Sequence, residues 1–333
     1  MSHLFGVASR SPLPQSPWRQ FAPWAVGVLV LLTVILAAIH FATLEQFARL
    51  AGGARLEWFL LACFVQAVTF PCEALAWRQA LREAGYPQPI WPLVPLGFAK
   101  QFMDQVVPSS GISGAALVAG GLVRRGIPAH VVMSVLLVGL VSYFAAYLIS
   151  VLASVVLLWL HHGVDAPLIA AVVVFGTAVL AIPTAVLWIK ATARQLPAQS
   201  LDWMPGGAAL RDAIAKAPSN LLYNPLLLVQ TVGLEIAGFA LDGLTLWLAF
   251  YALGVPVPIW IALVSFMIAS MTATIGPIPL GLGTFEAGCV GMLVLLGVSV
   301  EPALAATLLL RGLTFWLPMI PGLWLARREI TEG

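Results

Sequence analysis

Long apolar runs alternate with short polar connections along nearly the whole chain. Six of these runs are long enough to cross a bilayer as a helix, which needs about 20 largely apolar residues. The runs are Trp24–Phe41, Trp58–Leu75, Val131–Leu160, Ala166–Ile189, Leu226–Leu253 and Pro302–Leu325. The pattern therefore predicts an all-α polytopic membrane protein with about six full spans.

Two further apolar stretches are interrupted by clusters of proline and glycine. Ile90–Val123 is broken at Pro108–Gly114, and Ile259–Leu296 is broken at Gly276–Glu286. Proline removes a backbone donor, so such backbone is tolerated in a bilayer only where it is buried in protein or lines a wet cavity. We interpret each stretch as a re-entrant helical hairpin, with two short spans as the alternative.

The two interrupted stretches match each other at a constant offset of 171 residues. The matched positions are Pro108 with Pro279, Ser110 with Gly281, Ser113 with Thr284, and Gly126 with Gly297. If the N-terminus lies on the cytoplasmic side, as the distribution of Lys and Arg indicates, the first hairpin opens from the inside and the second from the outside. We interpret the pair as an inverted repeat, which is common in transporters. Two independent breaks that share proline and glycine for backbone reasons are the alternative.

The composition supports a membrane protein. Of the 333 residues, 61% are hydrophobic and only 9% are charged, whereas soluble domains carry roughly 25% charged residues. No charge-rich stretch is long enough for a sizeable soluble domain. The net charge of +2 is too small to indicate a nucleic-acid partner.

The basic residues orient the chain, because Lys and Arg concentrate on the cytoplasmic side of a membrane. With the N-terminus inside and both broken stretches as hairpins, only Arg49 and Arg55 fall outside, and Arg311 lies within a span. The inner face then holds Arg10, Arg19, Arg78, Arg82, Lys100, Arg124, Arg125, Lys190, Arg194, Arg211, Lys216, Arg327 and Arg328. We therefore expect a multi-pass protein of the bacterial inner membrane with both termini cytoplasmic.

This topology implies a simple domain organisation. A cytoplasmic tail is expected over residues 1–23, a single transmembrane domain over 24–328, and a second short cytoplasmic tail over 329–333. The first repeat has its break at 104–126 and the second at 275–297.

Metal and catalytic chemistry is not indicated. Cys63, Cys72 and Cys289 lie in apolar segments without the spacing of a metal or redox motif, and the five histidines form no metal-binding pattern. We expect no metal, no cofactor and no catalytic constellation.

Ionisable residues inside apolar segments are the strongest functional candidates, because each costs at least about 2.5 kcal/mol at the bilayer centre. Arg311 is the only basic residue expected so deep in a span. Its guanidinium is predicted either to bind a lipid phosphate bidentately or to form an ion pair with Glu286, Glu235 or Asp242.

The acidic candidates have structural interpretations as well. Glu286 follows the second break, where a carboxylate at a helix start is stabilised by the helix dipole. Asp104 precedes the first break and is placed to cap the broken helix through nearby amides. Glu73 lies near the end of the second span and is placed to reach the interface. Glu235 and Asp242 lie two turns apart on one helix face and are candidates for charge pairing or proton coupling.

The half-helices after the breaks form candidate anion sites. They are expected to begin near Ser113 and Thr284, with free amides directed at the break. The predicted substrate-binding residues are Arg311, Glu286, Ser109, Ser110, Ser113, Thr284, Gly281 and Gly283.

The residues around both breaks resemble a known family. Pro108–Gly114, followed by Arg124–Pro128, resembles the first signature of the lysylphosphatidylglycerol synthase/flippase transmembrane domain. Pro279–Glu286, followed by Gly297-Val298 and Arg311-Gly312, resembles its second signature.

This resemblance covers about Trp24 to Arg328 and implies a lipid flippase-like module. In that family the module is sometimes fused to a soluble aminoacyl transferase, but this chain stops at Gly333, so the membrane module alone is implied. Many members carry Glu and Arg after the first glycine cluster, where this chain has Ala115 and Ala116. The difference argues against an aminoacyl-phospholipid and favours other lipids, such as polyprenyl-linked carriers, glycolipids or hopanoids.

The sequence therefore predicts a stand-alone lipid transporter rather than an enzyme. Its substrate is expected to be an anionic or phosphate-containing lipid, held between two hairpins and Arg311. No ATP-binding motif is visible in the sequence. We therefore expect lipid transport to be either coupled to a gradient or facilitated. Expected partners are the lipid, a second copy of the chain or a lipid-synthesis enzyme. The alternatives are a non-catalytic partner of a lipid- or glycan-modifying synthase and an integral-membrane enzyme acting on lipid headgroups.

Overall fold

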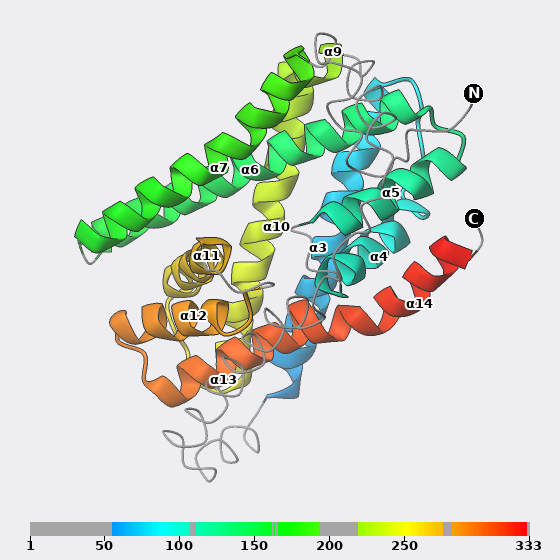
Figure 1. The fold of residues 1–333 in the computed structure, drawn as a ribbon. Coiled ribbons are helices and arrows are strands. Elements are labelled where there is room, and N and C mark those ends of the chain that lie inside the picture. Colours follow the sequence, from blue (N-terminus) through cyan, green and yellow to red (C-terminus); the bar gives the residue numbers. More distant parts are fainter. Residues whose placement is uncertain are drawn as a thin grey trace, which may run out of the picture.

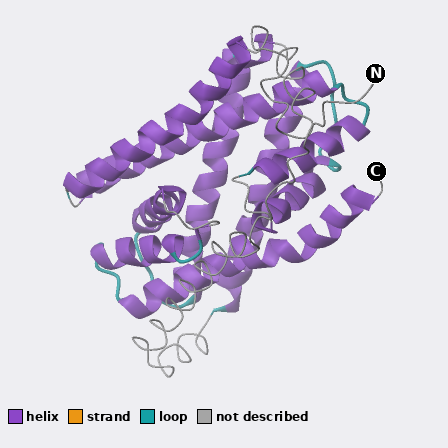
Figure 2. Ribbon diagram, viewed as in Figure 1, coloured by secondary structure: helices purple, strands orange, loops and turns teal. Residues whose placement is uncertain are grey.

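The computed structural model describes residues 55–106, 111–161, 163, 166–192, 219–275 and 281–331. Within these ranges every regular element is a helix (Figure 2). The predicted first span, Trp24–Phe41, and both predicted tails, apart from residues 329–331, lie outside them. The chain is thus all-helical over the part that the structure describes.

Five of the described helical segments are long and apolar enough to cross a membrane. They are α3 (Leu56–Glu83), α6 (Ala129–His161), α7 (Ala166–Thr192), α10 (Pro225–Ala252) and the continuous helix formed by α13 (Val300–Arg311), η3 (Gly312–Trp316) and α14 (Leu317–Thr331). Each contains one of the predicted spans, to within one residue at the end of α10, so the prediction of a multi-pass membrane protein is confirmed. Helix α3 includes Pro71 and extends beyond the predicted span Trp58–Leu75 to Glu83.

Both interrupted stretches form pairs of shorter helices. The first consists of α4 (Leu93–Val106) and α5 (Ile112–Arg124), and the second of α11 (Ile259–Ile275) and α12 (Thr284–Leu295). The centres of the breaks, residues 107–110 and 276–280, lie outside the described residues. The predicted Pro/Gly interruptions therefore do separate helices in the fold.

The turns that follow α5 and α12 have the same geometry. Gly126 and Gly297 both have positive φ angles, 81° and 89°. In each turn the glycine amide donates to the carbonyl three residues earlier, and the next amide donates to the carbonyl five residues earlier. The following helices begin at Ala129 and Val300. Glycine is favoured here because this left-handed C-terminal cap strains residues that carry a Cβ.

Helices α3 and α10 form the central antiparallel pair (Figure 1). Each has 28 residues. The amide of Arg55 donates to the carbonyl of Ala252 at 2.7 Å, and further along the pair the side chain of Gln66 bonds to Asp242. The start of α3 therefore packs against the end of α10.

Apolar side chains gather in two main cores. One lies among α3, α4, α5, the first half of α6, the short helix α9 (Ser219–Leu222) and the start of α10. The other lies among the second half of α6, α7, the end of α10 and α11–α13. A smaller cluster of Ala62, Leu248 and Leu313 connects α3, α10 and η3. Large apolar side chains on α6 and α7, such as Leu152, Val156 and Val173, remain exposed, as expected for surfaces that face lipid.

A π-helical turn, η3, interrupts the last long helix directly after Arg311. Pro318 and Pro321 follow within α14. Proline lacks the amide that an α-helix needs and its ring collides with the carbonyl four residues earlier, so a wider turn relieves the clash. Such π segments often occur at functional sites.

Close packing of α14 on α4 generates the first prediction. A Cβ at Gly322 would lie 2.7 Å from the Cβ of Phe102 and 2.9 Å from the carbonyl oxygen of Phe98. We expect G322A to lower the free energy of unfolding by about 1–3 kcal/mol through overpacking, measured by thermal unfolding in detergent. The control is G97A in α4, where a Cβ meets nothing within 4 Å. Equal melting of the two variants would contradict this packing.

Candidate functional site

Charged side chains converge at both breaks. We call Glu73, Lys100, Asp104, Ser113 and Gly114 the first centre, because they surround the start of α5. The second centre surrounds the start of α12 and consists of Gly283, Phe285, Glu286, Arg311 and Phe315.

Glu286 is the buried acid of the second centre. It lies in the first turn of α12 with only 3% of its surface exposed. Its Oε2 accepts a hydrogen bond from the amide of Gly283 at 2.6 Å, so the side chain caps its own helix. Gly283 has φ 81°, where a residue with a Cβ would be strained. The predicted capping role of Glu286 is thus present in the structure.

Arg311 reaches Glu286 from the end of α13. Its Nε donates to Glu286 Oε1 at 2.6 Å, and its side chain is 12% exposed. The guanidinium carbon lies 4.9 Å from the centroid of the Phe285 ring and 4.8 Å from that of Phe315, within cation–π range. Of the three acids considered as ion-pair partners of Arg311, the structure selects Glu286, and it places Asp242 in a different contact.

The end of the second break is tightly packed and contains a buried hydroxyl group. Gly281 has φ 62°, and a Cβ there would lie 2.6 Å from the Cβ of Ala273 in α11. The hydroxyl of Thr284 is buried and has no hydrogen-bond partner within the described part of the chain. A buried polar atom without a partner costs about 1–3 kcal/mol, so Thr284 offers one polar group that a ligand can satisfy.

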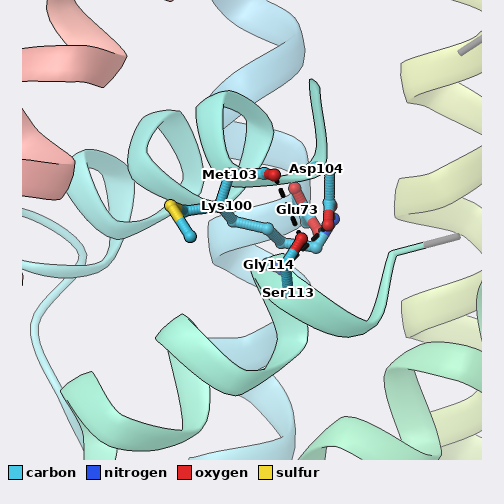
Figure 3. A network of polar contacts seen from close by, with 6 residues as sticks. All are labelled: Glu73, Lys100, Met103, Asp104, Ser113 and Gly114. Carbon is cyan, nitrogen blue, oxygen red and sulfur yellow. Dashed lines mark hydrogen bonds and ion pairs between the residues drawn. The ribbon is translucent and has the colours of Figure 1, made fainter. Parts of the chain in front are cut away.

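Asp104 joins the two helices of the first centre. Its Oδ1 accepts from the amide of Gly114 at 2.8 Å, which satisfies a free amide at the start of α5. A Cβ at Gly114 would collide with this carboxylate. The hydroxyl of Ser113 donates to the carbonyl of Met103 at 3.0 Å, and Figure 3 shows both bonds crossing between α4 and α5. The capping role predicted for Asp104 is therefore present.

Lys100 is the cation of the first centre, and the sequence interpretation had not singled it out. Its Nζ lies 2.9 Å from Glu73 Oε1 and 3.4 Å from Asp104 Oδ2, with 26% of the side chain exposed (Figure 3). The statement that Arg311 is the only deep basic residue was thus incomplete. The sequence could have predicted this ion pair, because Lys100 and Asp104 lie four residues apart in an apolar helix and therefore on one face.

The two centres share one arrangement. In each, a carboxylate accepts a backbone amide at the start of a half-helix and also pairs with a cation. Asp104 pairs with Lys100, four residues earlier on the same helix, and Glu286 pairs with Arg311 at the end of α13. They differ in charge: Arg311 faces one carboxylate, whereas Lys100 faces both Glu73 and Asp104.

The remaining predicted residues fall in three places. Glu235 in α10 lies within electrostatic range of Glu73 and Lys100, while Asp242, on the same helix, accepts from Gln66. The predicted donors Ser109 and Ser110 lie outside the described residues. No group of three or more potential metal ligands occurs in the described ranges.

Comparison with known proteins gives one match. The family model described as lysylphosphatidylglycerol synthase TM region matches residues 24–322. No curated protein sequence matches the chain. The match covers the described helices from α3 through the start of α14, including both charged centres.

The ion pair of the second centre generates the next prediction. E286Q leaves Arg311 buried without its carboxylate, and breaking a buried pair from one side costs about 3–5 kcal/mol. We expect a lower thermal midpoint in detergent for E286Q and partial recovery in the double variant E286Q/R311Q. The control is E83Q, at an exposed position at the end of α3. If E286Q melts like E83Q, the pair contributes no stability.

Proposed function

Since the chain belongs to the lysylphosphatidylglycerol synthase transmembrane family, we propose that it is a flippase-like transporter of the bacterial inner membrane. Its substrate is a lipid with an anionic or phosphate-containing headgroup, and it acts as a transporter rather than an enzyme. The observation that carries this proposal is the shared arrangement of the two centres, each with a cation beside the start of a half-helix.

Broken helices with charges are costly in lipid unless they line a protected path. Irregular backbone at membrane depth is tolerated only where it is buried in protein or lines a cavity. In secondary transporters, discontinuous helices of this kind form the substrate site, with half-helix starts directed at anionic groups. We therefore assign α4–α5 and α11–α12 as two re-entrant hairpins that flank the path of the headgroup.

Three observations support an inverted repeat. The turns after α5 and α12 have the same hydrogen bonds at the offset of 171 residues that the sequence predicted. The helices after these turns begin at equivalent positions, Ala129 and Val300. The helices that precede the two hairpins, α3 and α10, are equally long and run antiparallel. Equivalent helices of opposite direction are what an inverted repeat requires.

Arg311 is the proposed headgroup ligand. In the described state its guanidinium is held by Glu286, so a phosphate would bind by taking over this contact. Glu286 then keeps its bond to the Gly283 amide, which reduces the cost of losing the arginine. The unpartnered Thr284 hydroxyl lies at the start of the same helix and supplies a further donor to the phosphate.

The test is transport of lipid by the purified protein in liposomes. We expect the wild type to accelerate the transbilayer movement of a fluorescent anionic phospholipid, followed by chemical quenching from outside. A hydrogen bond to a charged group contributes about 1.5–3 kcal/mol, so R311Q/E286Q is expected to slow this movement by about 10–100-fold. The double variant is used because it leaves no buried charge unpaired.

The matched control is again E83Q, which keeps both centres intact. Transport by R311Q/E286Q at the wild-type rate would refute the headgroup role of Arg311. Absence of transport by the wild type with every anionic lipid tried would refute the transporter proposal and favour the alternative role as a partner of a lipid-modifying synthase.

A further inference from the structure

The central helix pair carries a polar contact that the two charged centres do not use. Gln66 of α3 is 6% exposed, and its Nε2 donates to Asp242 Oδ1 of α10 at 2.9 Å. The same nitrogen lies 3.2 Å from the hydroxyl oxygen of Thr69, which itself donates to the Gln66 carbonyl at 2.7 Å. Gln66 and Asp242 therefore link helices from the two halves of the chain.

One atom of this contact is left unsatisfied. Gln66 Oε1 is buried and has no hydrogen-bond partner among the residues that the structure describes. An ionised carboxylate can only accept hydrogen bonds, so beside ionised Asp242 the amide presents its nitrogen and its oxygen cannot pair with that carboxylate. Burying an unpaired carbonyl oxygen costs about 1–3 kcal/mol. The orphaned oxygen points to a second state in which Asp242 has something to donate.

No positive charge neutralises Asp242 among the described residues, since none of the ion pairs found there involves it. The titratable groups that share its surroundings are Glu235 on its own helix, Cys72 on α3 and Tyr143 on α6. Lys100 of α4 also acts on Tyr143 and Glu235, but its ion pairs are with Glu73 and Asp104. Helix α11 carries no ionisable side chain, and Arg311, at the end of α13, is bound to Glu286. A lone carboxylate in such surroundings favours uptake of a cation.

We propose that Asp242 and Gln66 form a proton-binding pair. When Asp242 is ionised, it accepts from Gln66 Nε2, as in the described state. When Asp242 takes a proton from the aqueous phase, the Gln66 amide reverses and its Oε1 accepts the new O–H. The reversal breaks the hydrogen bonds from Gln66 Nε2 to Asp242 and to the Thr69 hydroxyl and forms the one from the Asp242 O–H to Oε1. Loss of the proton to water restores the first state.

A proton fits this pair better than a metal cation. Hard cations require several oxygen ligands, whereas Gln66 already presents a nitrogen donor to the carboxylate and no metal-ligand group is found in the described ranges. A proton needs one acceptor, and the unpartnered oxygen supplies it.

This pair gives the transporter a route to coupling, a consequence that rests on the proposed function. Protonation reverses the direction of the hydrogen bond between α3 and α10: Asp242 becomes the donor and Gln66 the acceptor. This bond lies where the two halves of the chain meet. Movement of one half against the other is the usual basis of alternating access, so a change at this joint is placed to bias that movement.

Infrared difference spectroscopy tests the pair without any transport. We compare the full-length protein in lipid vesicles in mildly acidic and mildly alkaline buffer. We expect a carbonyl stretch from a protonated carboxyl group that is lost in D242N and shifted to higher frequency in Q66L, where the acceptor is missing. Q66L also provides the test if D242N fails to fold. E83Q serves as the control and should retain the band unchanged.

Two outcomes would overturn the proton pair. One is a band that is unchanged in both D242N and Q66L. The other is a band whose pH response differs between sodium buffer and potassium buffer of equal ionic strength. In that case a metal cation would be the occupant.

Coupling is tested separately in the liposome transport assay. We expect the wild-type rate to differ between acidic and alkaline buffer and D242N to give one rate in both. A pH-independent wild type with the infrared band present would refute coupling and leave the proton site in place. No transport at all would refute the proposed function without affecting the infrared result.

Discussion

The need to satisfy backbone polar groups inside a membrane governs this structure. Both broken helices begin again with free amides, and in both a carboxylate accepts one of them: Asp104 from α4 at Gly114, and Glu286 within α12 at Gly283. Each carboxylate brings a charge into an apolar segment, and Lys100 or Arg311 pairs with it. Backbone satisfaction thus explains why charges lie in otherwise apolar helices.

The two centres are not equivalent in their chemistry. Arg311 is paired with the carboxylate of Glu286, and its guanidinium lies within cation–π range of the rings of Phe285 and Phe315. Lys100 is more exposed and faces two carboxylates, with Glu235 in electrostatic range. Exchange of an anion onto Arg311 and exchange of protons near α10 are therefore compatible roles for different halves of the same framework.

Much of this arrangement was predictable from particular residues. The Pro/Gly clusters located both breaks, and the apolar runs located the long helices. Asp104 and Glu286 were identified as caps because each carboxylate adjoins a break. Lys100 and Gln66 were missed, because a single lysine near a loop resembles an interfacial anchor and a glutamine in an apolar run carries no charge signal. Their roles depend on partners in other helices, and Gln66 meets Asp242 across 176 positions of sequence.

The sequence by itself determined what depends on local composition: helical spans, their interruptions, the glycine turns, and which ionisable groups lie among apolar neighbours. These follow from hydrophobic run length and backbone chemistry, which need no tertiary contact. Only the tertiary structure decided which charges meet, that Arg311 selects Glu286, and that α3 and α10 lie antiparallel with Asp242 against Gln66. These contacts depend on distances between helices. The hydrophobic pattern of the sequence does not predict them, because apolar surfaces that face lipid and those that face another helix have the same composition.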